Sequence, residues 1–367
     1  MLRYRHLWPI IRQIPPELAH RLALWSLRMP WHYGEQVEDP FSWHGLTIRN
    51  RAGVAAGFDK NAVCLPGLER VGAGFVEVGT VLVEPWQGNQ VSLRMARLLQ
   101  LHGLWNRLGF TSHGLAQVQR NLARFPRERR HGMAVACNIG PHPGNLKRCT
   151  NRTEALTTAQ AELLQLAEAL HRHSDFLVVN LSSPNTPGLR SLLQSAELAD
   201  TVVMPIIQLS RRLDQATGRS WQTPVLVKLP PEDENQELWT TESLARVVQP
   251  LLAVEACDGF VAVNTSARLA MQHFPLGKDE LPGGLSGDPL REEALRVVTM
   301  LRRLIGPDRL LIGCGGVMMP EHGVGFLHAG ADLVELYSGM VFAGPALVSR
   351  SAKALKESPG TEVPGLS

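Results

Sequence analysis

The chain has 367 residues, 44% of them hydrophobic and 19% charged, which is the composition of a globular protein with a large core. A net charge of +3, with no Lys/Arg cluster interleaved with aromatic residues, argues against a nucleic-acid-binding protein. Five cysteines lie far apart without a C-x-x-C pair, so neither a zinc site nor a disulfide framework is predicted.

The first 45 residues are set apart from the rest of the chain by a basic amphipathic pattern. At 16–27, Leu18, Leu22 and Trp25 recur at i, i+4 and i+7, which places them on one helix face. Such a helix either packs on the rest of the protein or lies in a membrane interface. No apolar run reaches the ~20 residues that span a bilayer. Arg12 and the prolines after it interrupt the apolar core of a signal peptide, whereas a transit peptide stays open.

Eight short apolar runs, bounded by Gly, Pro or Asn, follow within residues 46–350. The runs lie at 54–56, 75–78, 133–137, 176–179, 225–229, 260–263, 310–312 and 333–336. Helix-like segments separate most of them, including 155–171, 189–213, 238–248 and 292–304. Apolar strands that alternate with helices indicate a parallel sheet covered on its outer side. Eight such units predict an α/β fold, a (β/α)8 TIM barrel at 46–350 with a small N-terminal helical extension at 1–45.

Two stretches depart from the repeating pattern of strands and helices. The segment 80–133 is longer than the other connections, so we expect inserted strands or loops there. The end of the chain, 351–367, is expected to be a disordered tail.

Polar residues follow all eight predicted strands. They are GFDK at 57–60, GT at 79–80, NIG at 138–140, NLSSPN at 180–185, Lys228, NTS at 264–266, GCGG at 313–316 and YSG at 337–339. A single Asn or Lys at a strand end is more often a cap or turn former than a ligand. Eight polar ends together favour an active site, because (β/α)8 barrels build theirs at the carboxyl ends of the strands.

The loops after the seventh and eighth strands predict a phosphate-bearing ligand. Barrels often bind phosphate at these two loops through backbone N–H groups. Glycines at 313–316 let the backbone approach an anion closely, and the loop at 337–339 adds hydroxyl and N–H donors. Lys60 and Lys228 are available from the barrel interior.

Four segments resemble the signatures of dihydroorotate dehydrogenases: GFDKN at 57–61, NRLGF at 106–110, NLSSPNTPG at 180–188 and GGLSG at 283–287. The resemblance runs from about Arg12 to Leu347, in the family's order. Ser183 occupies the place of the catalytic base, which is Ser in the membrane-associated, quinone-dependent class 2 and Cys in the soluble class 1. The N-terminal extension also resembles class 2.

The resemblance implies oxidation of dihydroorotate to orotate in pyrimidine biosynthesis, with FMN as hydride acceptor and a membrane quinone as final acceptor. The basic amphipathic start, together with the lack of a spanning run, predicts a peripheral protein on the cytoplasmic face of a bacterial inner membrane, and neither metal nor nucleic acid is expected as a partner. FMN would be bound by Ala56, Gly57, Phe58, Asp59, Lys60, Thr80, Asn138, Asn180, Lys228, Val263, Gly287, Gly316, Tyr337 and Ser338. The substrate would be bound by Lys60, Asn106, Arg107, Leu108, Gly109, Phe110, Asn185, Asn264 and Thr265. The quinone tunnel would be lined by His20, Arg97 and Tyr337.

Alternatives and departures accompany this interpretation. Val263 stands where the family usually has Thr, and Pro141 where it usually has Lys. A barrel flavoenzyme for another cyclic amide, a catalytically silent flavin-binding relative and a flavin-free sugar-phosphate isomerase are the rival hypotheses. The structural alternatives are turn caps for the three asparagines, a surface ion pair for Arg107 and a solvated helix position for His20.

Overall fold

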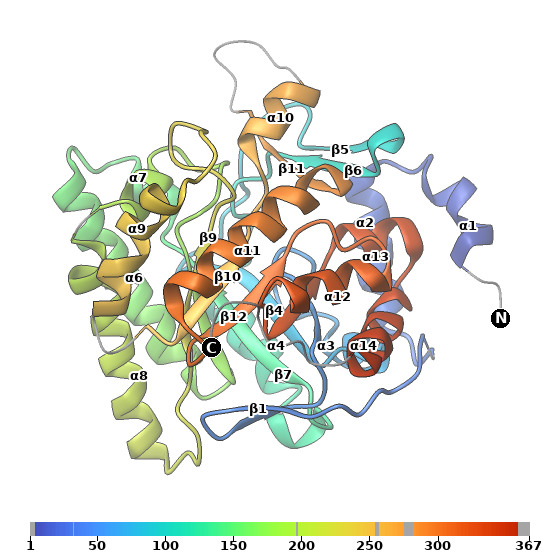
Figure 1. Ribbon diagram of the computed structural model, residues 1–367, viewed down its shortest axis with the longest axis horizontal. Coiled ribbons are helices and arrows are strands. Elements are labelled where there is room, and N and C mark those ends of the chain that lie inside the picture. Colours follow the sequence, from blue (N-terminus) through green and yellow to red (C-terminus); the bar gives the residue numbers. More distant parts are fainter. Residues whose placement is uncertain (1–3, 32, 196, 254–256, 275–281, 359–367) are drawn as a thin grey trace.

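The computed structural model describes residues 4–31, 33–195, 197–253, 257–274 and 282–358. Within them, eight parallel strands close into a barrel in the order β10-β12-β13-β3-β4-β7-β8-β9, which confirms the predicted fold (Figure 1). The strands are β3 (Ala52–Val54), β4 (Phe75–Val81), β7 (Ala134–Ile139), β8 (Phe176–Asn180), β9 (Val225–Leu229), β10 (Gly259–Ala262), β12 (Leu310–Cys314) and β13 (Leu333–Leu336).

Helices cover the outer side of the barrel. They are α3 (Leu65–Arg70), α4 (Leu115–Ala123), α6 (Arg152–His171), α8 (Met204–Thr217), α9 (Thr241–Ala253), α11 (Arg291–Ile305), α12 (Pro320–His328) and α14 (Leu347–Glu357). Short helices α5 (Pro143–Leu146), α7 (Leu189–Leu193), α10 (Ala267–His273) and α13 (Ser338–Ala343) lie in the connections. Helix α6 shows why such segments begin where they do, since the Asn151 side chain caps it by accepting from the Glu154 N–H.

Side chains along each barrel strand point alternately outward and inward, and this divides the apolar core into two clusters. One set of side chains packs against the helices, and the other forms an apolar cluster that includes Phe75, Phe176, Leu226 and Leu333. Leu46 and Ile48 join this second cluster from a hairpin of β1 (Phe41–Trp43) and β2 (Leu46–Ile48). Because successive side chains of a strand point to opposite faces, the residue two positions after each strand member of this second cluster points to the same face as that member. Several of those residues are polar or charged, namely Glu77, Asn138, Asn180, Lys228 and Glu335.

A three-stranded antiparallel sheet lies at one end of the barrel, beside α10 (Figure 1). Its order is β11-β6-β5, with β5 (Met95–Leu98), β6 (Gly103–Asn106) and β11 (Gly284–Gly287). Two of these strands are the insertion expected in 80–133. The sheet provides one wall above the carboxyl ends of the barrel strands.

The N-terminal extension contains two helices, α1 (Tyr4–Ile11) and α2 (Pro16–Arg28). Helix α2 confirms the predicted helix at 16–27 and contacts both α3 and β5, while α1 projects at the edge of the molecule (Figure 1). Arg97 on β5 holds the connection between the two helices by donating to the Ile14 carbonyl at 2.7 Å. No helix in the described part of the chain is long and apolar enough to cross a membrane.

Two expectations about helices are wrong. The segment 189–213 is not one helix: α7 ends at Leu193, a π-helical turn spans Ala199–Val203, and α8 begins at Met204. Pro205, in the first turn of α8, fits a helix start because a proline lacks the N–H that a helix interior requires. The tail predicted at 351–367 is also wrong in its first part, because α14 continues to Glu357 and buries Ala352 and Leu355. Residues 359–367 lie outside the described residues.

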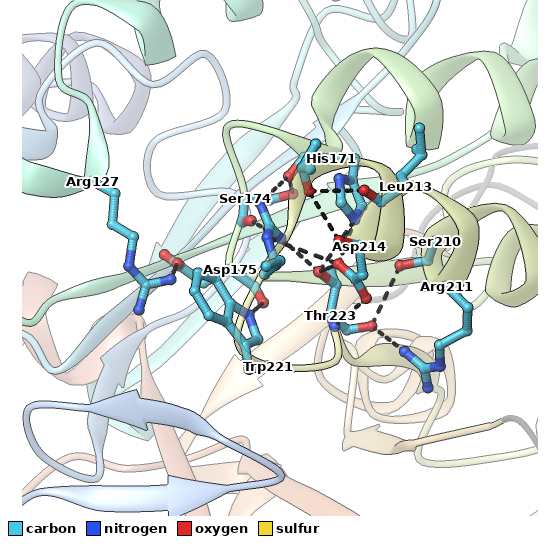
Figure 2. Close-up of polar contacts among 12 residues, drawn as sticks. Arg127, His171, Ser174, Asp175, Ser210, Arg211, Leu213, Asp214, Trp221 and Thr223 are labelled. Atoms are coloured by element: carbon cyan, nitrogen blue, oxygen red, sulfur yellow. Dashed lines mark hydrogen bonds and ion pairs between the residues drawn. The ribbon is translucent and has the colours of Figure 1, made fainter.

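Polar side chains brace the amino-terminal ends of β8 and β9 (Figure 2). The carboxylate of Asp214 accepts from Thr223 Oγ1 at 2.6 Å and lies 2.8 Å from His171 Nε2. Asp175 pairs with Arg130 at 3.0 Å. These groups satisfy one another, so we interpret them as links between α6, α8 and the barrel rather than as a reactive site.

Candidate active site

A pocket of about 1100 Å³, counted with the open space at its mouth, lies at the carboxyl ends of the barrel strands. It brings together residues that are far apart in the sequence, as expected for this fold. The predicted site residues that line it are Ala56, Gly57, Lys60, Thr80, Asn106, Leu108, Gly109, Phe110, Asn180, Ser183, Asn185, Lys228, Val263, Asn264, Thr265, Gly316, Tyr337 and Ser338.

Asn180, the last residue of β8, connects the polar groups on one side of the pocket. Its amide nitrogen donates to Thr80 Oγ1 at 3.0 Å and to Asn138 Oδ1 at 3.2 Å. Its amide oxygen accepts from Ser182 Oγ at 2.9 Å, and Ser182 Oγ in turn accepts from Asn264 at 2.9 Å. Each orientation is thereby specified by a neighbour, so these side chains are held rigidly around the pocket.

Three ionisable side chains meet at the inner end of the pocket, where Lys228 and Glu335 line it and Glu77 pairs with Lys228. Lys228 Nζ lies 3.0 and 3.2 Å from the two oxygens of Glu77, and 3.6 Å from Glu335 Oε2. Burial alone would lower the pKa of Lys228, but the carboxyl groups of Glu77 and Glu335 outweigh burial and raise it, so the ammonium stays charged. Burial would likewise raise the pKa of Glu77, but Lys228 and Asn138 bring it below its ordinary value.

Glu77 and Glu335 are functional candidates that the sequence analysis missed. Both lie inside strands that were interpreted only as apolar runs. A charged residue within such a run was the available signal, because burial without a partner is costly. Their partner Lys228 is 151 positions away from Glu77, so local pattern could not reveal the pairing.

Ser183 lies buried in the loop after β8 and faces the pocket. Its Oγ accepts from the Asn185 N–H at 3.2 Å, and the Asn185 side chain donates to Asn106 Oδ1 at 3.1 Å. Asn185 Oδ1 and Thr186 Oγ1 are buried and have no hydrogen-bond partner among the described residues. Unpaired buried acceptors of this kind fit a ligand that brings donors with it.

Lys60 enters the pocket from the loop after β3 and donates to Thr111 Oγ1 at 2.6 Å. Burial, followed by repulsion from Arg94, lowers the pKa of Lys60 to about 8. A ligand carboxylate beside this ammonium would raise the pKa again. Lys60 is therefore suited to binding an anion near neutral pH.

The glycine loop after β12 forms a close-packed part of the pocket. Gly316 has φ +72°, and a Cβ there would lie 2.6 to 2.9 Å from the Cβ, Cα and N of Arg291. Ser338 Oγ lies 2.9 Å from Ser286 Oγ, which joins this region to β11. The backbone of this loop therefore tolerates no side chain at Gly316.

Several predicted binding residues do not line the pocket. The Asp59 carboxylate accepts from the N–H groups of Val63 and Cys64 at 2.9 and 2.8 Å, so it shapes its own turn. Asn138 donates to Glu77 from behind Asn180. At Gly287, a Cβ would lie 2.2 Å from the carbonyl oxygen of His102, so its role is close packing.

Arg107 also lies outside the pocket lining. It is buried, its Nε donates to the Leu93 carbonyl at 2.7 Å, and its guanidinium lies 5.5 Å from the Trp105 ring centroid. Arg107 is 4% exposed, so it does not occupy the surface position considered for it.

His20 connects the N-terminal extension to the pocket. Its ring centroid lies 5.5 Å from that of Phe58 and 6.5 Å from that of Tyr337, which lines the pocket. Burial, then repulsion from Lys60, lowers the pKa of His20 to about 4, so the ring is neutral at pH 7. The solvated helix position considered for His20 is wrong. Arg97, in contrast, anchors the extension from β5 and does not line the pocket.

The comparisons with known proteins agree with one another. The dihydroorotate dehydrogenase family model matches residues 41–358. "Dihydroorotate dehydrogenase (quinone)" of Paracidovorax citrulli is 38% identical over 366 residues, covering 96% of both chains. The protein of the same name from Acidovorax sp. strain JS42 is 37% identical and covers 93% of this chain and 94% of its own.

Solved structures give the same result. The crystal structure of DHODH in complex with ferulenol from Eimeria tenella superposes with a TM-score of 0.80 at 28% identity, covering 93% of this chain and 90% of that chain. The ligand-free structure from the same organism has a TM-score of 0.77. The chain therefore belongs to the dihydroorotate dehydrogenase family, whose members oxidise dihydroorotate with a bound flavin.

Proposed function

We propose that this protein oxidises dihydroorotate to orotate with FMN as the bound flavin and a membrane quinone as the final electron acceptor. The observation that carries the proposal is the convergence of Ser183, Lys60 and the amides of Asn106, Asn185 and Asn264 on one pocket. Amide donors and acceptors complement a planar ring with N–H and C=O groups, and an ammonium complements its carboxylate.

FMN fits the glycine-lined side of this pocket. Gly316 and Ser338 both line the pocket, and a backbone without a Cβ together with a serine hydroxyl would suit a phosphate group there. Lys228 would lie at the ring of the flavin, where a cation stabilises the negative charge of the reduced form. The FMN-binding set is Ala56, Gly57, Lys60, Thr80, Asn180, Lys228, Val263, Gly316, Tyr337 and Ser338, with Phe58, Asp59, Asn138 and Gly287 supporting it from outside the lining.

The chemistry assigned to the protein is orientation and proton removal, and bound FMN would supply the acceptor for the hydride from C6 of the substrate. Lys60, Asn106 to Phe110, Asn185, Asn264 and Thr265 would orient the ring. Ser183 Oγ would take the proton from C5 as its own hydroxyl proton leaves through a relay. Thr186 suits that relay, because its hydroxyl is buried without a partner in the described chain.

Quinone would approach through the N-terminal extension. Leu18, Leu22 and Trp25 are 40%, 46% and 54% exposed on α2, whose other side contacts the barrel. An apolar stripe surrounded by arginines fits a membrane interface. His20, neutral and in contact with Tyr337, lies between this stripe and the pocket. We therefore propose peripheral binding to the cytoplasmic face of a bacterial inner membrane.

The test separates electron transfer to a soluble dye from electron transfer to quinone in vesicles. The purified protein should be yellow and should reduce the dye when dihydroorotate is added. Leu22→Asp with Trp25→Asp should impair quinone reduction far more than dye reduction. The control is Leu238→Asp, which changes a leucine of similar exposure, 42%, outside the extension. A protein without flavin would refute the proposed chemistry, and equal loss of both activities would refute the membrane role.

A further inference from the structure

At the inner end of the pocket, two buried carboxyl groups share one nearby ammonium. Glu77, Lys228 and Glu335 lie on β4, β9 and β13, and each is at most 4% exposed. Lys228 places its ammonium against both oxygens of Glu77, which also accepts from Asn138. Glu335 Oε2 lies 3.6 Å from the same ammonium, beyond hydrogen-bond distance.

Neither oxygen of Glu335 accepts a hydrogen bond within the described part of the chain, although the carboxyl group borders the pocket. A buried carboxylate without donors is expensive, and two carboxylates that share one cation are not both readily ionised. The two carboxyl groups converge on one ammonium, since Lys228 Nζ lies 3.0 Å from Glu77 Oε2 and 3.6 Å from Glu335 Oε2.

We propose that Glu335 is a neutral carboxylic acid, and that its proton keeps the Glu77–Lys228–Glu335 group uncharged overall beside the flavin. Without the proton, the group would carry a net charge of about −1 beside the ring that becomes negative on reduction. The proton thus allows Lys228 to stabilise the reduced flavin. The second half of this inference rests on the proposed binding of FMN in this pocket.

The neighbours of Glu335 support this charge state. Glu77 on β4, Lys228 on β9 and the Cys314 thiol on β12 face it, and the adjoining β3 offers no titratable side chain. Burial, then repulsion from Glu77, raises the pKa of Glu335 well above its ordinary value. Burial raises the pKa of Cys314 as well, so the thiol adds no charge at neutral pH.

The test compares wild-type holoenzyme with Glu335→Gln, which keeps the shape of the side chain but has no acidic proton. In the infrared spectrum at neutral pH, the wild type should show a protonated-carboxyl band that the variant lacks. The midpoint potential of bound FMN should be similar in both proteins at neutral pH. At alkaline pH, ionisation of Glu335 in the wild type should weaken the binding of reduced FMN relative to oxidised FMN by about tenfold. The midpoint potential of the wild type should then fall by about 30 mV, whereas that of the variant should not.

The matched control is Asp332→Asn, which removes a partly buried acid just before β13, where Asp332 pairs with Arg302 at 2.7 Å. It should leave the pH dependence of the potential unchanged. The inference would be overturned if Glu335 is ionised at neutral pH. It would also be overturned if the midpoint potential of FMN depends on pH in the same way in Glu335→Gln and in the wild type. A protein that binds no FMN would refute the proposed function instead, and its infrared spectrum would still decide whether Glu335 is protonated.

Discussion

Replacing Lys228 with Met removes the cation next to two buried carboxyl groups while keeping a long unbranched side chain. Lys228 Nζ lies 3.0 and 3.2 Å from the oxygens of Glu77, and the two side chains are 5% and 0% exposed. Removing one partner of such a pair leaves an uncompensated buried charge. We therefore expect the free energy of unfolding to fall by about 3–5 kcal/mol at neutral pH.

The loss of stability in Lys228→Met should depend on pH, and the pKa of Glu77 determines in which direction. In the wild type, the pKa of Glu77 is lower in the folded protein than in the unfolded chain, where it is about 4.3. Pairing of Glu77 therefore stabilises the fold at pH values above about 4.3, and this stabilisation is lost as the pH falls through the pKa of the folded state. In Lys228→Met the pKa of Glu77 should be raised instead. The variant would then lose stability as pH rises from about 4.3, so its deficit is largest near neutrality and shrinks in acid.

Urea denaturation followed by tryptophan fluorescence at several pH values measures this deficit. Adding Glu77→Gln to Lys228→Met should recover part of the loss, because the unpaired charge is removed with its partner. The control, Lys353→Met, changes an exposed lysine and should alter stability little. A deficit below about 1 kcal/mol at neutral pH, or one that grows in acid, would refute the reasoning.

Three further predictions concern the ligands. Because the pKa of Lys60 is about 8 in the free protein, orotate affinity should fall as pH rises through that value, and a dissociation constant that does not change with pH in flavin-spectrum titrations would contradict this. Gly316→Ala should weaken FMN binding at least about tenfold, as measured by titration of apoprotein, since its Cβ would meet the backbone of α11. Gly218→Ala, with φ +64° but open space around it, is the control for backbone strain alone. Ser183→Ala should lower dihydroorotate turnover by about 10²–10⁴-fold while orotate still binds, whereas Ser191→Ala, an exposed site, should turn over normally.

Local pattern in the sequence was sufficient to predict the barrel and the gathering of polar residues at one end of it, where the pocket lies. Each apolar strand is followed by polar residues, and parallel strands bring those residues to one end. The glycine loop at 313–316 was also predicted to lie at this end of the barrel, and Gly316 does line the pocket. The helix at 16–27 followed from its own period.

Charge balance and long-range contact were decided only by the tertiary structure. Glu77 and Glu335 are hidden within apolar strands, and their meeting with Lys228 depends on closure of the barrel between segments that share no local pattern. The contact of His20 with Tyr337 likewise depends on where α2 docks. Side-chain period determines which face a residue occupies, but the partner across that face is set by strand order and register, which are properties of the whole sheet.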